Sequence, residues 1–407
     1  MEEWIRYRAI DFCASVTDGT HDSPKPNETG HYLITSKHLR NNSIDFSSAY
    51  RISEEDYQKV IQRSQVVQYD ILFSMIGTIG NTVRVTTPFV DFAVKNMAIF
   101  KMGGNELKSK WLYYWLQSDF AKEYISSRLA GSTQSYLTLD SLRNFPVVAP
   151  DEKTMTRIVD ILSSIDSKIE INNRINHNLE EQAQALYKSW FVDFEPFKGG
   201  EFADSELGLI PAGWRVGTLS ELGDIVAGGT PPKSKPEYYT NNGIAWLTPK
   251  DLSVKCNKFT ARGETDITED GYKNSSAKLM PRGSVLFSSR APIGYISIAK
   301  GYICTNQGFK SVVPTYAGTA YIYYWLLENT DAIESQASGS TFKEASGSLM
   351  KSFPALVPEK SVLDSFEKEL APILNEQEVL EKEIYHAEQI RNSLLPRLMS
   401  GELVMNC

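Results

Sequence analysis

Polar residues that could recognise a nucleic acid recur at matching positions in the two halves of this chain. Thr20 and Thr230 each follow a glycine, at a spacing of 210 residues. Amide side chains can donate to and accept from one base edge, while lysines and small hydroxyls contact phosphates. These residue types therefore indicate recognition and not covalent chemistry. The matched pairs are Thr20 and Thr230, Lys37 and Lys250, and Asn96 and Asn306.

Further candidates lie in loops of the same two halves. Arg290 is the best candidate for a guanine contact, because a guanidinium can donate two parallel hydrogen bonds to one guanine. The glycines before Thr20 and Thr230 could bring backbone amides close to a phosphate. Each candidate could instead be an ordinary turn-forming or solvent-exposed residue. The remaining candidates are Ser74, Ser132, Thr133, Gln134, Lys233, Lys235, Ser288, Ser289, Gln307, Ser340 and Thr341.

An internal duplication positions these residues. Segment 70–80 matches segment 284–294, and the Tyr-Tyr-Trp-Leu run at 113–116 recurs at 323–326. Gly-Ser-Thr at 131–133 recurs at 339–341. Because the period is too long for a solenoid, each copy is expected to be a separate domain. Each is predicted to be an α+β domain of short strands.

The elements around these motifs can be placed from periodicity. A tryptophan-led strand is predicted to open each copy, at 4–10 and at 214–220, and helices are predicted at 107–128 and 320–334. The predicted domains are residues 1–150 and 199–358, with long helical regions at 151–198 and 359–407.

Each long helical region carries an apolar seam with 4–3 spacing. This spacing predicts an antiparallel coiled coil of two long helices. Asn172, Asn176 and Gln377 would be polar seam residues that fix the register. Packing of each helix against its own domain is the alternative. The apolar seam residues are Ile158, Leu162, Ile165, Ile169, Leu179, Leu186, Leu370, Ile373, Leu380, Ile384 and Leu394.

The charge distribution separates the domains from the helices. The net charge is −8, yet residues 1–150 and 201–358 are each neutral, so the acidic excess lies in the two helical regions. Residues 230–310 hold twelve Lys and Arg against six Asp and Glu. A basic stretch on an acidic chain could face phosphates, or it could be an ordinary solvated surface.

Sequence signatures of catalysis, metal binding and membrane insertion are missing. We find no phosphate-binding loop, no His-Glu-x-x-His pair and no Gly-x-Ser-x-Gly elbow. The four cysteines are scattered without metal-type spacing, which suits a reducing cytoplasm. No apolar run reaches the length of a membrane span. We therefore expect a cytoplasmic binding protein that has no catalytic residues, metal or cofactor of its own.

Taken together, the repeated motifs resemble the specificity subunits of Type I restriction-modification systems. The resemblance covers essentially the whole chain. It rests on the order of several motifs, each weak alone, in two copies. They are Leu-Ile-Pro-Ala-Gly-Trp at 209–214, Gly-Gly-Thr-Pro at 228–231, Gly-Ser-Val-Leu-Phe-Ser at 283–288 and Thr-Asn-Gln-Gly at 305–308.

The resemblance implies two target recognition domains that each recognise one half of a bipartite sequence in double-stranded DNA. It also implies that the helices form the spacer and dock two methyltransferase subunits, and that restriction subunits join them. S-adenosylmethionine, ATP and magnesium would then belong to the partners. Because matched positions differ, as at Ile76 and Arg290, the full target is expected to be asymmetric.

Two other functions remain open from the sequence. The chain could be a tandem-domain protein-interaction scaffold that never binds nucleic acid, which its acidic total charge would suit. It could also be a self-contained methyltransferase or nuclease, which the missing motifs oppose. Salt-dependent DNA binding and activity assays of the purified chain would separate the three.

Overall fold

The computed structural model describes residues 4–40, 42–130, 135–254, 257–339 and 343–403. The chain divides into two compact units. Unit 1 comprises Met1–Ile169 and His386–Cys407, and unit 2 comprises Glu170–Tyr385. Each unit therefore combines one domain with a part of both long helices, which are α6 (Glu152–Phe191) and α12 (Lys360–Met399).

The domain of unit 1 alternates short strands with short helices. In chain order its elements are β1 (Ile5–Arg8), α1 (Ala9–Phe12), β2 (Ser15–Asp18), β3 (His31–Ile34), the 3-10 turn η1 (Ser36–His38), β4 (Leu39–Arg40), β5 (Ser43–Ile44), β6 (Arg51–Ile52), α2 (Glu54–Ser64), β7 (Ile71–Ser74), β8 (Thr82–Arg84), β9 (Phe92–Val94), β10 (Met97–Lys101), α3 (Glu106–Leu116), α4 (Asp119–Ser127), α5 (Leu139–Arg143) and β11 (Pro146–Ala149).

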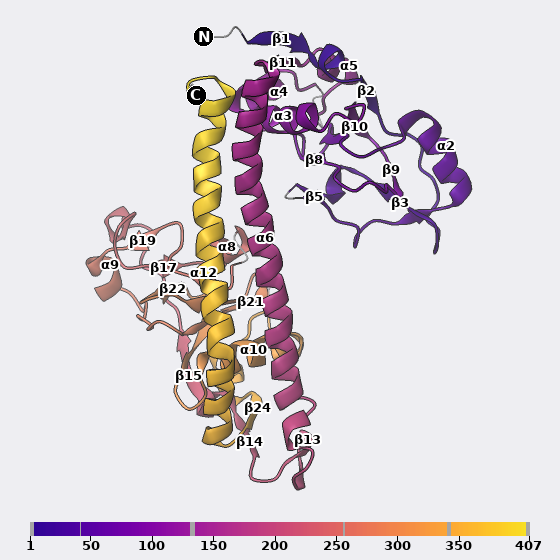
Figure 1. The fold of residues 1–407 in the computed structure, drawn as a ribbon. Coiled ribbons are helices and arrows are strands. Elements are labelled where there is room, and N and C mark those ends of the chain that lie inside the picture. Colours follow the sequence, from indigo (N-terminus) through magenta and orange to yellow (C-terminus); the bar gives the residue numbers. More distant parts are fainter. Residues whose placement is uncertain (1–3, 41, 131–134, 255–256, 340–342, 404–407) are drawn as a thin grey trace. The chain divides into compact units, whose positions relative to one another are not determined.

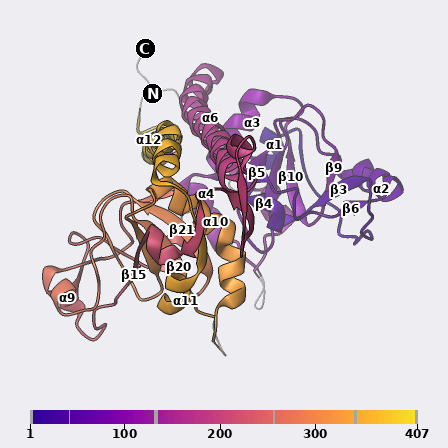
Figure 2. The ribbon, with the colours of Figure 1, turned by 90° about the horizontal axis from the view of Figure 1, so that it is seen from below.

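An antiparallel sheet of four strands, ordered β2-β10-β7-β8, forms the centre of that domain. β7 is buried along its whole length because its residues Ile71, Leu72 and Phe73 are apolar on both faces. A second sheet, β6-β3-β9, contains a parallel pair, and α2 packs on β9 (Figure 2).

The domain of unit 2 repeats this plan with longer strands. Its elements are the 3-10 turn η2 (Glu195–Phe197), β12 (Phe202–Ser205), β13 (Gly208–Pro211), β14 (Arg215–Thr218), α7 (Leu219–Leu222), β15 (Gly223–Ala227), the 3-10 turn η3 (Pro236–Tyr238), β16 (Tyr239–Thr240), β17 (Trp246–Leu247), α8 (Pro249–Val254), β18 (Phe259–Thr260), β19 (Asp266–Ile267), α9 (Glu269–Lys273), β20 (Val285–Ser289), β21 (Ile293–Ala299), β22 (Cys304–Thr305), β23 (Lys310–Pro314), α10 (Thr319–Gln336), α11 (Gly347–Ser352) and β24 (Pro354–Val357).

Its central sheet has the order β15-β23-β20-β21-β18 and is antiparallel except for the pair β18 and β21. The buried strand β20 corresponds to β7, and α10 lies against β21 (Figure 2). In the two units, β1 pairs with β11 and β14 with β24 in the same register. The duplication expected from the sequence is therefore present in the fold.

One predicted element differs between the copies. The helix expected over 107–128 is broken into α3 and α4, whereas its counterpart α10 is continuous. The break occurs at Ser118, whose hydroxyl accepts a hydrogen bond from the amide of Ala121 at 3.2 Å and so caps α4. A serine in this position competes with the helix for backbone hydrogen bonds and starts a new one.

The long helices run antiparallel within each unit (Figure 1). In unit 1, Arg391 of α12 contacts Asp166 of α6 at 3.1 Å. In unit 2, Asn172 of α6 donates to Glu383 of α12 at 3.0 Å, and Glu180 of α6 accepts from Gln377 of α12 at 3.0 Å. Rising numbers on α6 thus face falling numbers on α12, as the predicted antiparallel coiled coil requires.

Both modes of helix packing considered from the sequence occur together. Seam residues Leu162 in unit 1 and Leu370 in unit 2 are fully buried, and so is the polar seam residue Gln377. Other residues of the helices enter the domain cores, as Met155 does in unit 1 and Tyr187 in unit 2. Each domain is therefore attached to the helices by a continuous apolar core.

Candidate nucleic-acid interface

The candidate residues gather at one edge of each central sheet. In unit 1, β2 and β7 end at this edge and β10 begins there, because β10 lies between them and is antiparallel to both. The same holds for β15, β20 and β23 in unit 2. Loops that are distant in sequence are thereby brought side by side, once in each unit.

A glycine turn packs against the loop before β10 in unit 1. The amide of Gly19 donates to the carbonyl of Met97 at 2.8 Å, and the amide of Asn96 donates to the carbonyl of Thr20 at 3.1 Å. A Cβ on Gly19 would lie 2.4 Å from the carbonyl oxygen of Val94, so a larger residue cannot fit. Thr20 and Asn96 are thus neighbours at the edge.

The matching turn of unit 2 has a similar packing. The Gly229 amide donates to the carbonyl of Thr305 at 2.8 Å, and the hydroxyl of Thr230 donates to the side chain of Gln307. Asn306 accepts from the amide of Gly308 at 2.8 Å through its side-chain oxygen, which leaves its amide group outside this bond. Thr230, Asn306 and Gln307 therefore share one surface.

The expectation that the two glycine turns offer backbone amides to phosphate is wrong for three amides. The amides of Gly19 and Gly229 donate to carbonyls within the domain, and so does the amide of Thr20, which donates to Val94 at 3.0 Å. The turns instead position the threonine side chains.

Three of the five serine candidates need a second correction. Ser74, Ser288 and Ser289 are fully buried, since each lies at the end of a central strand. The hydroxyl of Ser74 donates to the carbonyl of Thr78 at 2.7 Å, and that of Ser288 to the carbonyl of Pro292 at 2.9 Å. These serines shape the loops after the strands and are not placed to contact a duplex.

Arg290 is partly exposed at the edge of unit 2. One of its guanidinium nitrogens lies 3.5 Å from a carboxylate oxygen of Glu344, and 37% of its side chain is exposed. Lys310, which is nearly buried, contacts the other oxygen of Glu344 at 3.0 Å. Arg290 is therefore oriented by a carboxylate that the sequence analysis did not single out.

The lysine candidates are exposed around the same edge. Lys37 lies in η1 next to Ser36, whose hydroxyl faces Gly77 in the loop after β7. Lys250 is the second residue of α8, after Pro249, which lies beside Gly308, and it has a 3.5 Å contact with Glu264. Lys233 and Lys235 follow the turn of unit 2, and Lys235 lies 5.1 Å from the ring centre of Tyr238.

The last candidates of each unit lie in a segment whose flanking residues pair with one another. We call these flanking residues, Ala130 and Tyr136 in unit 1 and Ser338 and Glu344 in unit 2, the hairpin base. Ser132, Thr133, Gln134, Ser340 and Thr341 lie outside the described residues. At the base, Tyr136 exchanges backbone hydrogen bonds with Ala130, and Glu344 with Ser338. Tyr136 and Glu344 are 208 residues apart, so extending the repeat by three residues beyond Gly-Ser-Thr would have found both.

Charged residues that sequence reasoning missed surround Asn96 in unit 1. The two ring nitrogens of His21 contact the side chains of Asn96 and Asp18, each at 2.9 Å. Arg63 of α2 contacts the other oxygen of Asp18 at 2.5 Å, and Lys95 donates to Ser23. The His21 ring could therefore hold Asn96 in a fixed orientation.

Three features of the described parts of the chain concern other kinds of site. No three His, Cys, Asp or Glu side chains there are placed to hold a metal ion. None of the helices described there could span a membrane. Burial raises the pKa of the Cys13 and Cys304 thiols to about 12, so neither is an activated nucleophile.

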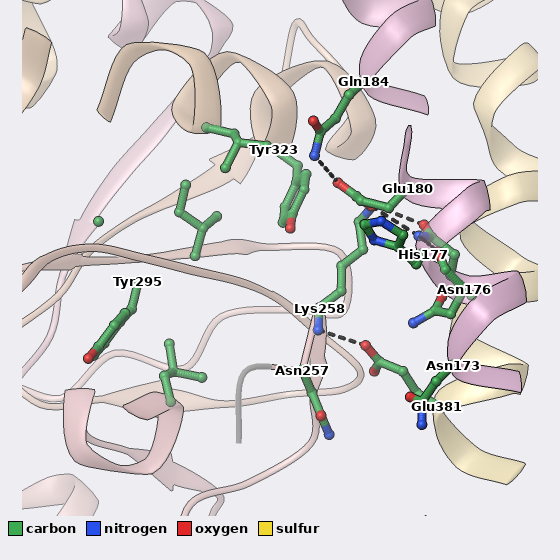
Figure 3. A pocket seen from close by; sticks show the side chains of 15 residues that line it. Asn173, Asn176, His177, Glu180, Gln184, Asn257, Lys258, Tyr295, Tyr323 and Glu381 are labelled. Carbon is green, nitrogen blue, oxygen red and sulfur yellow. Dashed lines mark hydrogen bonds and ion pairs between the residues drawn. The ribbon is translucent and has the colours of Figure 1, made fainter. Parts of the chain in front are cut away.

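Unit 2 also has a polar cavity of about 440 Å³ where the domain meets the helices (Figure 3). Lys258 lies in its wall, only 8% exposed, and its ammonium donates to Glu180 of α6 at 2.5 Å and to Gln377 of α12 at 2.9 Å. Glu381 of α12 accepts from the backbone amide of Lys258 at 2.7 Å. One lysine thus joins the domain to both helices.

Comparison with known proteins gives the family. The family model of the Type I restriction modification DNA specificity domain matches residues 1–181 and 211–382. The chain belongs to this family. The two matches fall on the two copies of the duplication, so both domains are DNA specificity domains by descent.

Similarity to individual specificity subunits covers the whole chain in one case and about half of it in another. The specificity subunit of Type I restriction enzyme HindI from Haemophilus influenzae is 24% identical over 469 aligned positions, covering 99% of this chain and all of the relative. The MjaIX specificity subunit from Methanocaldococcus jannaschii is 37% identical over 192 residues, which are 45% of this chain and 44% of that relative.

A solved structure shares the fold. The crystal structure of a Type I restriction-modification system S subunit from M. genitalium has a TM-score of 0.62 and 15% sequence identity. The match covers 98% of this chain and 96% of that one. A duplicated mixed α/β architecture with long helices is therefore common to both.

Proposed function

We propose that this chain is the DNA-recognising subunit of a Type I restriction-modification complex, in which each domain binds one half of a bipartite, asymmetric target. The observation that carries this proposal is that the candidate loops gather at the same end of the central sheet in both units. Each unit presents a threonine turn and an asparagine loop on the same scaffold, with different side chains around them. Equal scaffolds with unequal side chains suit two different half-sites.

The long helices have two tasks in this proposal. They separate the domains, so they set the number of base pairs between the half-sites, and they dock two methyltransferase subunits. Their acidic excess supports docking of protein, because a phosphate backbone would be repelled. Restriction subunits complete the complex. S-adenosylmethionine, ATP and magnesium are bound by those partners in the cytoplasm, and this chain catalyses neither methylation nor cleavage.

Mapping of methylated adenine across the genome tests this function directly. Cells with and without this gene are compared by sequencing that detects the modified base. We expect a gapped, asymmetric motif that disappears on deletion. A motif that persists without the gene would overturn the proposal.

A protein-interaction scaffold is the second candidate, favoured by the acidic helices alone. The two functions differ in salt dependence. Affinity of the assembled complex for duplex DNA should fall steeply between 50 and 200 mM salt if phosphates are contacted, by about a thousandfold for six contacts. A complex with no measurable affinity for DNA at low salt would favour the scaffold.

A further inference from the structure

The loop after the central strand has positive φ angles at matching positions in both units. Gly77 and Ala291 both have positive φ angles, of 76° and 52°, and so do Gly80 and Gly294, at 93° and 99°. These residues are matched at a spacing of 214. The residues just before Gly77 and Ala291 are Ile76 and Arg290, so they occupy equivalent places.

The hairpin base meets this loop in the same way in both units. The amide of Leu137 donates to the carbonyl of Met75 at 3.0 Å, and the amide of Ala345 donates to the carbonyl of Ser289 at 2.9 Å. Tyr136 and Glu344 precede those two amide donors. Tyr136 therefore adjoins Ile76, with which it forms a β-bridge, as Glu344 adjoins Arg290.

The two pairs differ in chemistry although matching backbone hydrogen bonds hold them. Unit 1 has an aliphatic side chain beside a phenol that is 42% exposed. Unit 2 has a guanidinium beside a carboxylate, with 37% and 36% of the side chains exposed. Both members of the pair change together between the copies, as expected of neighbours that act as one recognition element.

We propose that Glu344, anchored by Lys310, is a positioning residue that aims Arg290 at a guanine, and that positions 290 and 344, like 76 and 136, form the specificity-determining pair of each domain. The inference rests on the proposed DNA-recognition function. Lys310 is 9% exposed and lies 3.0 Å from Glu344, so the carboxylate is fixed from the inside. Its contact to Arg290 is longer and uses one nitrogen, which leaves the rest of the fork for a base.

A carboxylate beside Arg290 has a second effect. It repels phosphate oxygens, so it discourages Arg290 from binding the backbone of any sequence. Removal of this charge should therefore strengthen binding to non-cognate DNA while it weakens discrimination. Removal of a glutamate with a purely structural role would not raise non-cognate affinity while lowering discrimination.

The test uses the full chain assembled with its methyltransferase subunits and duplexes carrying the mapped target. Duplexes with each base pair of the second half-site substituted serve as competitors. For Glu344→Gln we expect the ratio of cognate to substituted affinity to fall about tenfold at one guanine, with non-cognate affinity equal or higher. Arg290→Ala should lose the preference for the same guanine. The double variant Arg290→Ala with Glu344→Gln should lose no more discrimination than Arg290→Ala alone. Glu221→Gln is the matched control and should change nothing, because it removes a carboxylate of α7 that pairs with Arg215 of β14, at the start of β15 and not at the end where the candidate loops lie.

Transplanting the pair tests the second part. Arg290→Ile with Glu344→Tyr should alter the methylated motif in the second half-site only. An unchanged motif would overturn the inference. So would an equal loss of affinity on all sequences for Glu344→Gln. Losses of discrimination that multiply in the double variant would also overturn it. A wild-type complex without sequence preference would overturn the proposed function itself. If the wild-type complex is sequence-specific and Glu344→Gln has no effect, only the inference about Glu344 fails.

Discussion

Gln377 of α12 donates its side-chain amide to Glu180 of α6 at 3.0 Å, and the same carboxylate accepts from Lys258 of the domain. Burial raises the pKa of the Glu180 carboxyl, but the Lys258 charge and these hydrogen bonds outweigh it, and the net direction is downward. Glu180 therefore remains ionised, and the two polar residues fix how the helices and the domain meet in unit 2.

Replacing Lys258 by methionine should destabilise unit 2 by about 3–5 kcal/mol, because the buried Glu180 carboxylate and Gln377 would lose their cation. Urea unfolding followed by tryptophan fluorescence measures the shift. Lys250→Met, which removes an exposed lysine paired at 3.5 Å, is the control and should cost less than about 1 kcal/mol. If Glu180→Gln in the Lys258→Met background recovered nothing, the buried charge would not be the cause.

Inserting one heptad into each long helix, after Ile169 and after Tyr385, should lengthen the gap in the methylated motif. Seven helical residues add about 10 Å, which is about three base pairs at roughly 3.4 Å each. The seam stays in register because its repeat is seven. Methylome mapping of the variant should give the same half-sites with a longer gap. An unchanged gap would show that the helices do not set the spacing.

Gly19→Ala should weaken recognition of the first half-site selectively. The new Cβ would meet the carbonyl oxygen of Val94 at 2.4 Å, so the turn that carries Thr20 must move away from Asn96. Binding to duplexes with a substituted first half-site measures the discrimination, which we expect to fall at least fivefold. Gly199→Ala is the control, since nothing lies within 4 Å of its Cβ. Equal losses at both half-sites would argue against separate domains for each.

Stability of unit 1 should depend on pH through His31. Burial alone would lower the pKa of this imidazole, but hydrogen bonds with Glu54, at 2.6 Å, and with Asp91 raise it above its usual value. The protonated form is therefore favoured by folding. Its contribution is complete below the unfolded pKa of about 6.5 and is lost as the pH rises through the folded value.

His31→Gln measures this contribution. The stability difference between wild type and variant should be largest below about pH 6.5 and should shrink as the pH rises through the folded value. Its size should stay below about 1 kcal/mol because both carboxylates are well exposed. A difference that grows with pH would have the wrong sign for this ion pair.

The sequence was a good guide where periodicity or repetition carried the information. The heptad spacing located both long helices, and the repeat correctly grouped Thr20 with Asn96 in unit 1 and Thr230 with Asn306 in unit 2. It failed at Ser74, Ser288 and Ser289, because a serine that ends a buried strand looks the same in sequence as one that begins an exposed loop.

Residues that act through tertiary contacts were also missed. Lys258 was counted only as part of a basic stretch, since its partners on α6 and α12 are 78 and 119 residues away. Glu344 was missed because its partner Arg290 is reached only through the pairing of a hairpin with a strand end. Neither contact leaves a local pattern.

The core of unit 1 contains Leu395, Leu398 and Met399 of α12 together with Trp111 and Phe145 of the first domain. During synthesis on the ribosome, the first domain therefore emerges about 250 residues before the helix that completes its core. At roughly 5–20 residues per second, this interval lasts tens of seconds or less. Throughout it, the apolar surface that α12 will cover is exposed, so this domain is the one expected to need a chaperone in the cell.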